Sequence, residues 1–291
     1  MAAHKPVSTD DTVPVGPTLS MFDPVYLGID EAAEPVYLPL MYNNLLVGGV
    51  PGAGKSALLS LIVAHAALAY DARLCLIGGK QVELGLWRHA ADVFVGPDID
   101  HAITPLRRLQ TVMDNRYRYL TDNERRKVER GDGMNAIVLA VDEIAYFSAT
   151  IGDKATRDLF SALLRDIVAR GRAVAIMVVG ATQRPTADII PTSLRDIFSW
   201  RFAGRCTTDT SSDVILGYGW AARGYSAATI SPAEQGVGWL IAEEGTPRRI
   251  KVAYLTDADI IRVAAFAAAI RRHGQLPADG AGSEPDTGQT D

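Results

Sequence analysis

The residues from Gly49 to Ser56 have the types and the spacing of a loop that binds phosphate. They fit the pattern G-x-x-x-x-G-K-[ST], and they join the apolar run 44–49 to the helical pattern 55–69, which is the context that this motif requires. The glycines let backbone N–H groups turn towards phosphate oxygens, and the N-terminus of the following helix adds partial positive charge. We therefore expect nucleotide contacts from Gly49, Val50, Pro51, Gly52, Ala53, Gly54, Lys55, Ser56 and Ala57.

Two side chains of this loop have separate expected roles. Lys55 would reach the β- and γ-phosphates of a nucleoside triphosphate, and the hydroxyl of Ser56 would coordinate Mg²⁺. The alternative is a glycine-rich turn that matches the pattern by chance and binds nothing. The strand and helix patterns on either side favour the phosphate loop.

An acidic pair, Asp142 and Glu143, ends the apolar run 136–141, which is typical of a strand buried on both faces. An acid at this place can hold the hydration shell of Mg²⁺, and we assign that role to Asp142. Glu143 is then free to orient and deprotonate an attacking water, which suits hydrolysis better than phosphoryl transfer to a bound acceptor. The alternative, a solvated acid pair at a strand end, is less favoured because the phosphate loop is present.

Polar residues also end the apolar run 173–183 and follow it. The amide of Gln183 can hydrogen-bond an attacking water or a γ-phosphate and so detect its loss, or it is a structural loop residue. Arginines near these segments are candidates for a finger that completes the site of a neighbouring subunit, with a surface role as the alternative. These arginines are Arg170, Arg172, Arg184 and Arg195.

Alternating strands and helices must position these three clusters. The alternation favours an α/β fold with a doubly wound, mostly parallel sheet and helices on both faces. Ligands of such sheets lie at the carboxyl ends of the strands, so the clusters should meet at one site. Further predicted elements are a strand at 73–79, helices from 104, at 156–169 and at 257–271, and a hairpin of "GVGWLIA" and "RIKVAYL".

Composition and charge limit the classes of protein. The chain has 291 residues, 48% of them apolar, and a net charge of −5, so any nucleic-acid partner must meet local patches. The basic run 107–130 is one such patch, but interspersed acids favour a solvated helix face. Cys75 and Cys206 form neither a disulfide framework nor a zinc spacing. No apolar run reaches the about 18–20 residues of a membrane span, so we expect a cytoplasmic protein without an intrinsic transmembrane segment.

The expected organisation is one packed domain between two tails. Residues 1–22 are polar and contain proline, and they predict a flexible tail. Residues 273–291 are rich in glycine, proline and acids, and they predict a disordered acidic tail. The packed domain is expected to span residues 23–272.

Four stretches together resemble the motor domain of the FtsK/SpoIIIE family: "NNLLVGGVPGAGKSALL", "LCLIGGKQVEL", "AVDEIAYF" and a long segment that begins "ARGRAVAIMVVGATQRP". The resemblance extends over about residues 25–255. It implies a RecA-like ATPase that assembles as a hexameric ring and pumps double-stranded DNA, with ATP and Mg²⁺ as cofactors. It also implies specific roles: Lys55 and Ser56 in Walker A, Asp142 and Glu143 in Walker B, Gln183 as the sensor and Arg172 as the trans arginine finger.

The chain departs from this family in two respects. The family's "DPK" after the second strand reads Gly78-Gly79-Lys80 here, so a strand-end acid is missing. The short leader and the single helix expected after residue 257 predict no membrane helices and no winged helix like those of the large chromosome-segregation pumps. The compact form resembles the short conjugal transfer proteins of actinomycete plasmids and integrative elements. That resemblance implies conjugative DNA transfer, with a membrane-protein partner as a further expectation.

Other functions remain open at this point. Related secretion motors move protein cargo, which the acidic balance would suit, although such relatives usually string several motor cores in one chain. A chromosome-partitioning DNA pump would carry the same motifs. A non-motor nucleotide-binding switch, stable as a monomer, is the third alternative.

Overall fold

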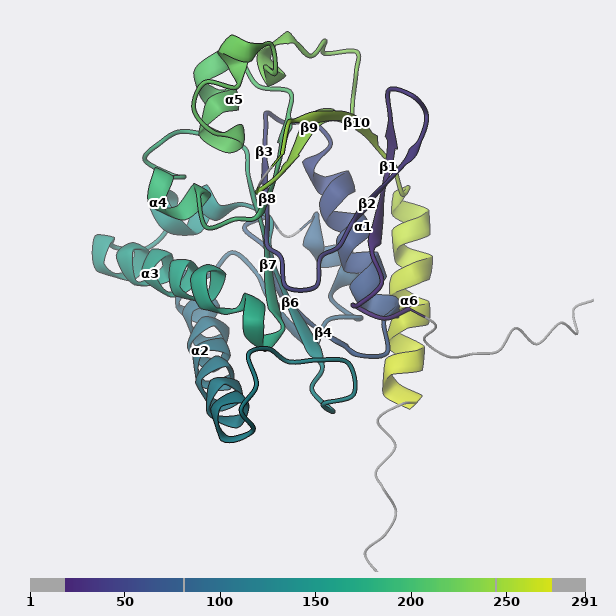
Figure 1. Cartoon of the computed structure of the whole chain (residues 1–291), viewed down its shortest axis with the longest axis vertical. Helices are drawn as coiled ribbons and strands as arrows, with labels where there is room; N and C mark the ends of the chain where they lie inside the picture. The colour runs from purple at the N-terminus through teal and green to yellow at the C-terminus, as the bar shows by residue number, and fades with distance from the viewer. Residues whose placement is uncertain (1–18, 81, 244, 274–291) are drawn as a thin grey trace, which may run out of the picture.

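A single mixed sheet runs through the computed structural model, and helices pack on both of its faces (Figure 1). The structure describes residues 19–80, 82–243 and 245–273. The predicted tails, 1–22 and 273–291, lie almost entirely outside these residues, and their flexibility stays a prediction. The ten strands of the sheet follow the order β2-β1-β10-β9-β8-β3-β7-β6-β4-β5.

Six neighbouring strands, from β8 to β5 in this order, run parallel and form the parallel half of the sheet. Leu45 of β3 pairs with Val179 of β7 on one side and with Trp200 of β8 on the other. The strands β6 and β7 are buried along almost their whole length, as expected where helices cover both faces. The predicted α/β sheet is therefore confirmed. The six strands are β3 (Leu45–Gly48), β4 (Ala72–Ile77), β5 (Val93–Val95), β6 (Ala136–Val141), β7 (Ile176–Thr182) and β8 (Trp200–Gly204).

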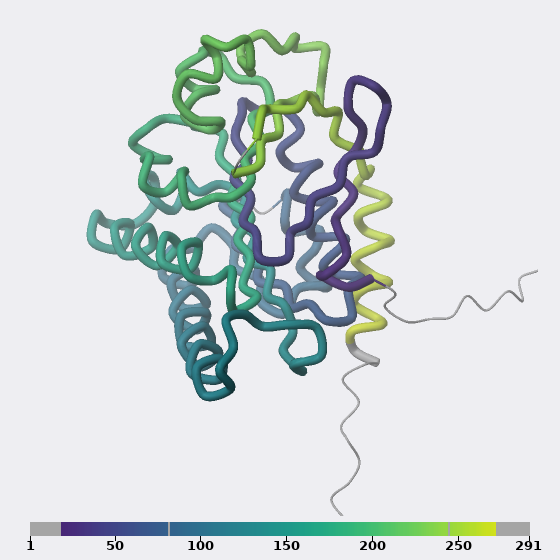
Figure 2. Tube along the Cα trace, viewed as in Figure 1, coloured from purple at the N-terminus to yellow at the C-terminus, as the bar shows by residue number. Residues whose placement is uncertain are grey.

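Four further strands extend the sheet beyond β8 and form its antiparallel half. The predicted hairpin is confirmed as β9 (Val237–Ala242) and β10 (Arg248–Val252). The strands β1 (Val25–Asp30) and β2 (Pro35–Leu38) were not predicted, and β1 pairs with β10. Figure 2 shows these N-terminal strands, in purple, beside the yellow-green hairpin from the C-terminal part of the chain.

Two pairs of helices cover the parallel half from opposite sides (Figure 1). The pair α1 (Lys55–Leu68) and α6 (Asp257–His273) packs on one side, and α2 (Ile99–Asp122) and α3 (Lys154–Arg170) pack together on the other. None of the helices within the described residues is long and apolar enough to cross a bilayer. Shorter helices are η1 (Leu84–Trp87), η2 (Tyr146–Thr150), η3 (Arg172–Val174), α4 (Thr192–Arg195), α5 (Asp209–Leu216), η4 (Ala221–Arg223) and η5 (Ala227–Thr229).

The starts of two helices show how local hydrogen bonds set the boundaries. The helix predicted from residue 104 begins at Ile99, because the Asp98 side chain accepts a hydrogen bond from the His101 amide at 3.0 Å. At α6 the helix start is capped in the same way, since the Asp259 amide donates to the Thr256 hydroxyl at 3.1 Å.

Candidate nucleotide site

The three polar clusters meet at the carboxyl edge of the parallel half, as the sequence predicts. The strands β3, β7 and β6 are neighbours, so the phosphate loop, Gln183 and the acidic pair follow adjacent strands. A cavity of about 450 Å³ opens at this edge, which is within the range of small-molecule sites. The cavity is lined by the phosphate loop, Lys80, Glu83 and Gln183, and by residues of the antiparallel half.

The backbone conformation of the phosphate loop requires a glycine at position 54. Gly54, which precedes α1, has φ of +91°, a conformation that glycine adopts at little cost. A Cβ added to it would lie 2.5 Å from the Cα of Gly236, so a side chain there would collide with backbone. The loop is also tied to the segment after β8, because the Val50 amide donates to the Arg205 carbonyl at 2.9 Å.

Lys55 lies almost completely buried inside this loop, with 6% of its surface exposed. Its ammonium donates to the carbonyl of Val50 at 2.8 Å. Burial lowers the pKa of Lys55 to about 8, although Glu143 and Glu83 act in the opposite direction. A phosphate would offer this buried cation a far stronger partner than a carbonyl oxygen does.

Asp142 has the environment expected of a carboxylate that meets a metal. It is 3% exposed, its Oδ1 accepts a hydrogen bond from the Gly79 amide at 2.6 Å, and its buried Oδ2 has no partner among the described residues. Burial raises the pKa of Asp142 to about 7, against the lowering effect of the Gly79 hydrogen bond. Gly79 is one of the residues that stand where the family has "DPK". At this strand end, which lacks the family's acid, its backbone amide holds Asp142.

The oxygen atoms at this edge fit Mg²⁺, which prefers oxygen ligands and keeps several waters. Ser56, in the first turn of α1, lines the cavity with its neighbours in the loop. The unpartnered Oδ2 of Asp142 would accept from a water of the ion's shell, and the Ser56 hydroxyl would bind the ion directly. The assignment of Ser56 and Asp142 as the metal residues stays a prediction, now with an orphaned buried oxygen to support it.

Glu143 is held by the end of the neighbouring strand. Its carboxylate accepts hydrogen bonds from the Thr182 hydroxyl at 2.9 Å, from the Gln183 amide at 3.0 Å and from the Ala145 amide at 3.3 Å. Thr182 is fully buried, and its hydroxyl also accepts from the Arg184 amide at 3.1 Å. The sequence places Thr182 in the polar cluster but gives it no role. Its position as the last residue of β7, next to Gln183, is the signal that could have revealed one.

Gln183 contributes twice to this arrangement. Its backbone amide holds Glu143, and its side chain lines the cavity. The side-chain amide lines the same cavity as the phosphate loop, where the predicted contact with a γ-phosphate or an attacking water would form. It remains a prediction.

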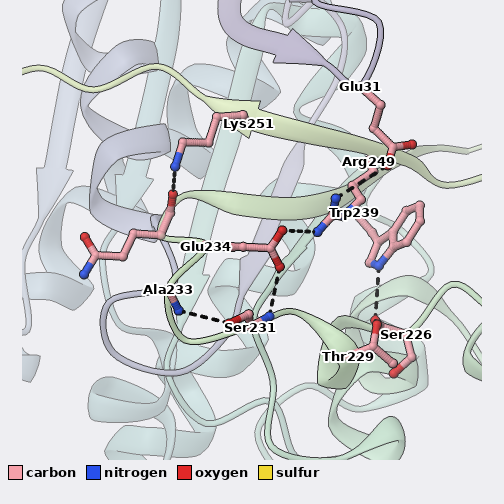
Figure 3. Close-up of polar contacts among 10 residues, drawn as sticks. Glu31, Ser226, Thr229, Ser231, Ala233, Glu234, Trp239, Arg249 and Lys251 are labelled. Atoms are coloured by element: carbon pink, nitrogen blue, oxygen red, sulfur yellow. Dashed lines mark hydrogen bonds and ion pairs between the residues drawn. The ribbon is translucent and has the colours of Figure 1, made fainter.

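The antiparallel half supplies a wall of the cavity that sequence reasoning missed. Gln235, Gly236, Lys251 and Tyr254 line it, although they lie about 180 residues or more beyond the phosphate loop. One contact braces this wall: the ammonium of Lys251 donates to the carbonyl of Gln235 (Figure 3).

The loop that carries this wall is fixed by a second set of contacts, also drawn in Figure 3. The Glu234 carboxylate accepts from Arg249 of β10 at 2.6 Å and from the Ser231 amide at 3.0 Å. Pairing of β9 with β10 brings these residues together. No local pattern in the sequence announces a contact of this kind.

Arg172 lies away from the cavity of its own chain. It precedes β7, so it sits at the amino edge of the parallel half, opposite the carboxyl edge that carries the phosphate loop. Its Nε donates to the Tyr42 carbonyl at 2.8 Å, and its guanidinium meets Glu243 at 3.3 Å. The residue does not complete its own site, and a role in a neighbouring subunit stays a prediction.

Other arginines noted in the sequence have structural partners. Arg170 pairs with Asp166 at 2.7 Å, and Arg195 pairs with Asp196 at 2.7 Å. In the basic run 107–130, Arg116 is half-buried and donates to the carbonyls that flank β6 and β7, so it fixes the sheet rather than facing solvent. Much of the run is exposed, as expected.

Known proteins are similar to this chain in sequence and in fold. Residues 8–147 match the model of the FtsK/SpoIIIE family. The DNA translocase FtsK of Chlorobaculum tepidum is 26% identical over 275 residues, which cover 85% of this chain and 32% of that protein. The FtsK of Staphylococcus aureus is 26% identical over 258 residues, covering 81% and 31%. This chain therefore spans about a third of the length of these relatives.

Two solved structures show the same fold. The pCW3 conjugation coupling protein TcpA with ATPγS has a TM-score of 0.73 at 17% identity, covering 86% of this chain and 71% of that chain. EssC (ATPases 2 and 3) from Geobacillus thermodenitrificans has a TM-score of 0.71 at 13% identity, covering 90% and 52%. The phosphate loop and the acidic pair lie inside the region that matches the FtsK/SpoIIIE family model, and the chain shares the fold of these solved structures.

Proposed function

We propose that this protein hydrolyses ATP and uses the energy to move double-stranded DNA. The observation that carries the proposal is the meeting of Lys55, Asp142 and Glu143 at one edge of the sheet, in a chain whose residues 8–147 match the FtsK/SpoIIIE family model. The curated relatives are DNA translocases, and their substrate comes to this chain only by inference. A buried cation, a buried orphaned carboxylate oxygen and a fixed second carboxylate are the parts that triphosphate hydrolysis needs.

Each residue has one task in the proposed hydrolysis. Lys55 leaves the Val50 carbonyl and binds the β- and γ-phosphates, while the loop's backbone amides hold the other phosphate oxygens. When bound, Mg²⁺ neutralises charge on the phosphates. Glu143 takes the proton of the attacking water, and Gln183 hydrogen-bonds that water or the γ-phosphate. The barrier is lowered mainly by positioning and by charge.

We further propose that the protein works as a homo-hexameric ring in conjugative DNA transfer. A ring lets Arg172 of one subunit reach the nucleotide of the next, which its place at the opposite edge of the sheet permits. A coupling protein of conjugation shares the fold, which is compatible with this role. We infer a cytoplasmic ring that meets the membrane through a partner protein.

Contact with DNA would come from loops at the carboxyl edge, next to the nucleotide. The segments after Tyr146 and after Pro185 are our candidates, with Lys154 and Arg157 near the first. Lys154 is highly exposed, and within the described part of the chain its one ion pair is with the exposed Asp158 at 3.0 Å, an interaction that a DNA phosphate would readily replace. Arg195, a further candidate, is mostly buried against Asp196 and is the weaker choice.

The deciding experiment measures ATP hydrolysis with and without linear duplex DNA at low salt, where phosphate contacts are strongest. We expect stimulation by duplex DNA in the unmodified protein and no turnover in Lys55→Ala. Absence of both stimulation and DNA binding at low salt would refute the translocase proposal. Hydrolysis without any DNA response would leave an ATPase with another cargo.

Protein cargo is the second candidate, favoured by the net charge of −5. The type VII secretion ATPase EccC of Thermomonospora curvata shares this fold, and at 19% identity it indicates nothing further about cargo. Stimulation of hydrolysis by a secreted protein instead of DNA would select this candidate. Chromosome partitioning would give the same response to DNA as conjugation, and neighbouring integrase or excisionase genes would separate the two.

A further inference from the structure

The glycine pair at the end of β4, Gly78-Gly79, lies against a tyrosine. A Cβ added to Gly79 would lie 3.1 Å from the Cβ of Tyr146 and 3.2 Å from two carbons of its ring. Carbon atoms in ordinary contact are about 3.5–4.0 Å apart, so the Gly79 backbone already touches the tyrosine. Gly79 is not one of the glycines with positive φ. Close packing on Tyr146 therefore accounts for glycine at this position.

The same glycine orients the carboxylate that we assign to the metal. The Gly79 amide donates to Oδ1 of Asp142 at 2.6 Å, and the buried Oδ2 has no partner within the described part of the chain. Because the amide holds Oδ1, the direction in which Oδ2 points depends on where the amide lies. Groups that orient a metal residue from behind typically change metal affinity about 10–100-fold when they are altered.

Two contacts hold the Gly79 amide in this place. The Gly78 amide donates to the Val95 carbonyl at 2.8 Å, which ties the glycine pair to the end of β5. The side chain of Tyr146 packs on Gly79 itself. Glycine has more backbone freedom than any other residue, so a glycine pair keeps one orientation only where its neighbours block the others. The tyrosine ring occupies the space into which Gly79 could otherwise turn.

Tyr146 is itself firmly held. Its backbone amide donates to the Glu143 carbonyl at 3.2 Å, and its hydroxyl meets the Pro97 carbonyl at 3.4 Å. Its ring meets the edge of Phe147 with centroids 5.2 Å apart, and the fully buried Phe147 stacks on Phe160 of α3 at 5.1 Å. The contact of the hydroxyl is long for an O–H···O bond. Ring packing therefore holds the side chain more than the hydroxyl does.

The turn that carries Tyr146 has an unusual geometry. The helix η2 (Tyr146–Thr150) is a π-helix, in which the Ile151 amide donates to the Tyr146 carbonyl at 3.0 Å. The hydroxyl of Ser148 is buried in this turn and has no partner among the described residues, which costs free energy. Turns of this kind are rare and occur frequently at functional sites. This one begins three residues after Glu143 and presents its first ring to Gly79.

We propose that Tyr146 is a positioning residue of the nucleotide site, whose ring fixes Gly79 so that the Gly79 amide turns Asp142 towards the hydration shell of the metal. The inference rests on the proposed function, because it assumes that the site binds a triphosphate with Mg²⁺. It gives a role to the departure Gly78-Gly79, where a tyrosine packed on glycine does the work of ordering this strand end.

The test separates the contribution of the metal from that of the phosphates. The probe is AMPPCP, an ATP analogue with a methylene group in place of the β–γ bridging oxygen, so that it is not hydrolysed. Calorimetry measures its dissociation constant for the full chain in Mg²⁺ and in EDTA, and the gain in affinity with Mg²⁺ reports on the metal. For Tyr146→Ala we expect this gain to fall about tenfold. Affinity in EDTA should not change, because the phosphate loop is untouched.

Two variants control for the loss of an aromatic ring. Tyr146→Phe keeps the ring and should retain the full gain with Mg²⁺. Tyr225→Ala removes another half-buried tyrosine, whose ring meets the edge of Trp239 at 5.3 Å and which does not line the nucleotide cavity. That variant should also retain the full gain.

A reciprocal variant approaches the same contact from the glycine. Gly79→Ala adds the Cβ that would press on Tyr146, so the gain with Mg²⁺ should fall as in Tyr146→Ala. The double variant should lose no more than the worse single variant, because both act through one amide. Additive losses would show that the two residues act independently, and they would overturn the proposal.

The other outcomes fall on defined statements. An unchanged gain with Mg²⁺ in Tyr146→Ala overturns the positioning role while the nucleotide site stands. Equal losses of affinity in Mg²⁺ and in EDTA also overturn it, because Tyr146 would then support the fold of the whole site. If the unmodified protein binds AMPPCP without any gain from Mg²⁺, the inference falls together with the metal role of Asp142. If it binds no AMPPCP at all, the proposed function itself falls.

Discussion

The two halves of the sheet build the same site in different ways. In the parallel half, the functional groups lie at strand ends and are buried, as Lys55, Asp142 and Glu143 show with at most 8% of their surface exposed. In the antiparallel half, the cavity wall is braced by partly exposed polar contacts, such as the ion pair of Arg249 with Glu234. The first half depends on buried hydrogen bonds and the second on shape and strand pairing.

Because of this difference, we expect the two halves to respond differently to substitutions that remove a polar contact. A buried polar group that loses its partner costs far more free energy than an exposed ion pair that breaks. ATP hydrolysis at the carboxyl edge of the parallel half should therefore fall when a substitution replaces a single polar atom. The antiparallel wall should tolerate the loss of individual polar contacts and respond to changes of backbone position.

The largest effect is expected for Glu143→Gln. The amide cannot accept a proton, and general base catalysis contributes about 10²–10⁴-fold to rates, so hydrolysis should fall by about this factor. Binding of ATP should persist, because the phosphate loop is unchanged. Single-turnover hydrolysis and equilibrium ATP binding measure the two quantities. Normal hydrolysis in this variant would remove Glu143 from the role of base.

Asn44→Ala tests whether buried hydrogen bonds hold the parallel half together. Asn44 is fully buried, its Nδ2 donates to the Val168 carbonyl at 2.8 Å, and its Oδ1 accepts from the Val178 amide at 2.7 Å. The substitution leaves two buried backbone groups unpaired, so the free energy of unfolding should fall by about 2–4 kcal/mol. Urea unfolding measures this change.

Asn123→Ala is the matched control for that substitution. Asn123 is exposed at the end of α2, and its Nδ2 donates to the Tyr119 carbonyl at 2.8 Å. Water can replace this bond, so the unfolding free energy should stay nearly constant. Equal losses in the two variants would contradict the contrast between buried and exposed contacts.

Thr182→Val asks whether the end of β7 positions the base. The substitution keeps the shape of the side chain and removes the hydroxyl that donates to Glu143 at 2.9 Å. A hydrogen bond to a charged group contributes about 1.5 kcal/mol or more, so kcat should fall about tenfold. KM for ATP should stay the same, and Thr182→Ser should restore kcat. A rise in KM with unchanged kcat would show that Thr182 supports nucleotide binding instead.

The sequence predicts the parallel half well because its signals are local. The run 136–141 and the phosphate loop each announce a strand or a turn within about ten residues. The strands β1 and β2 give no such signal, because they are short, alternate buried with exposed residues and contain a bulge at Gly28. Exposed tyrosines and a proline in these runs further hide the pattern.

The cavity wall was missed for a related physical reason. Gln235 and Lys251 reach the phosphate loop only after β9 and β10 join β8, a contact between segments distant in the chain. Spacing along the sequence carries no record of such pairing. The role of Thr182 was missed because a hydroxyl at a strand end has many uses, and only the position of Glu143 selects among them.

Apart from the control, the smallest effect is expected for Arg249→Ala, which breaks the ion pair with Glu234. The two side chains are 28% and 37% exposed, and an ion pair that water still reaches contributes little to stability. The change in unfolding free energy should be less than about a quarter of that caused by Asn44→Ala. Combining it with Glu234→Gln, which keeps an oxygen for the Ser231 amide, isolates the pair in a double-mutant cycle. A coupling energy as large as the Asn44→Ala effect would show that contacts of the antiparallel wall stabilise the fold as much as those of the catalytic edge.

In that case ATP binding would fall together with the unfolding free energy in the Arg249→Ala protein, because the loop at Gly236 that packs on Gly54 would have moved.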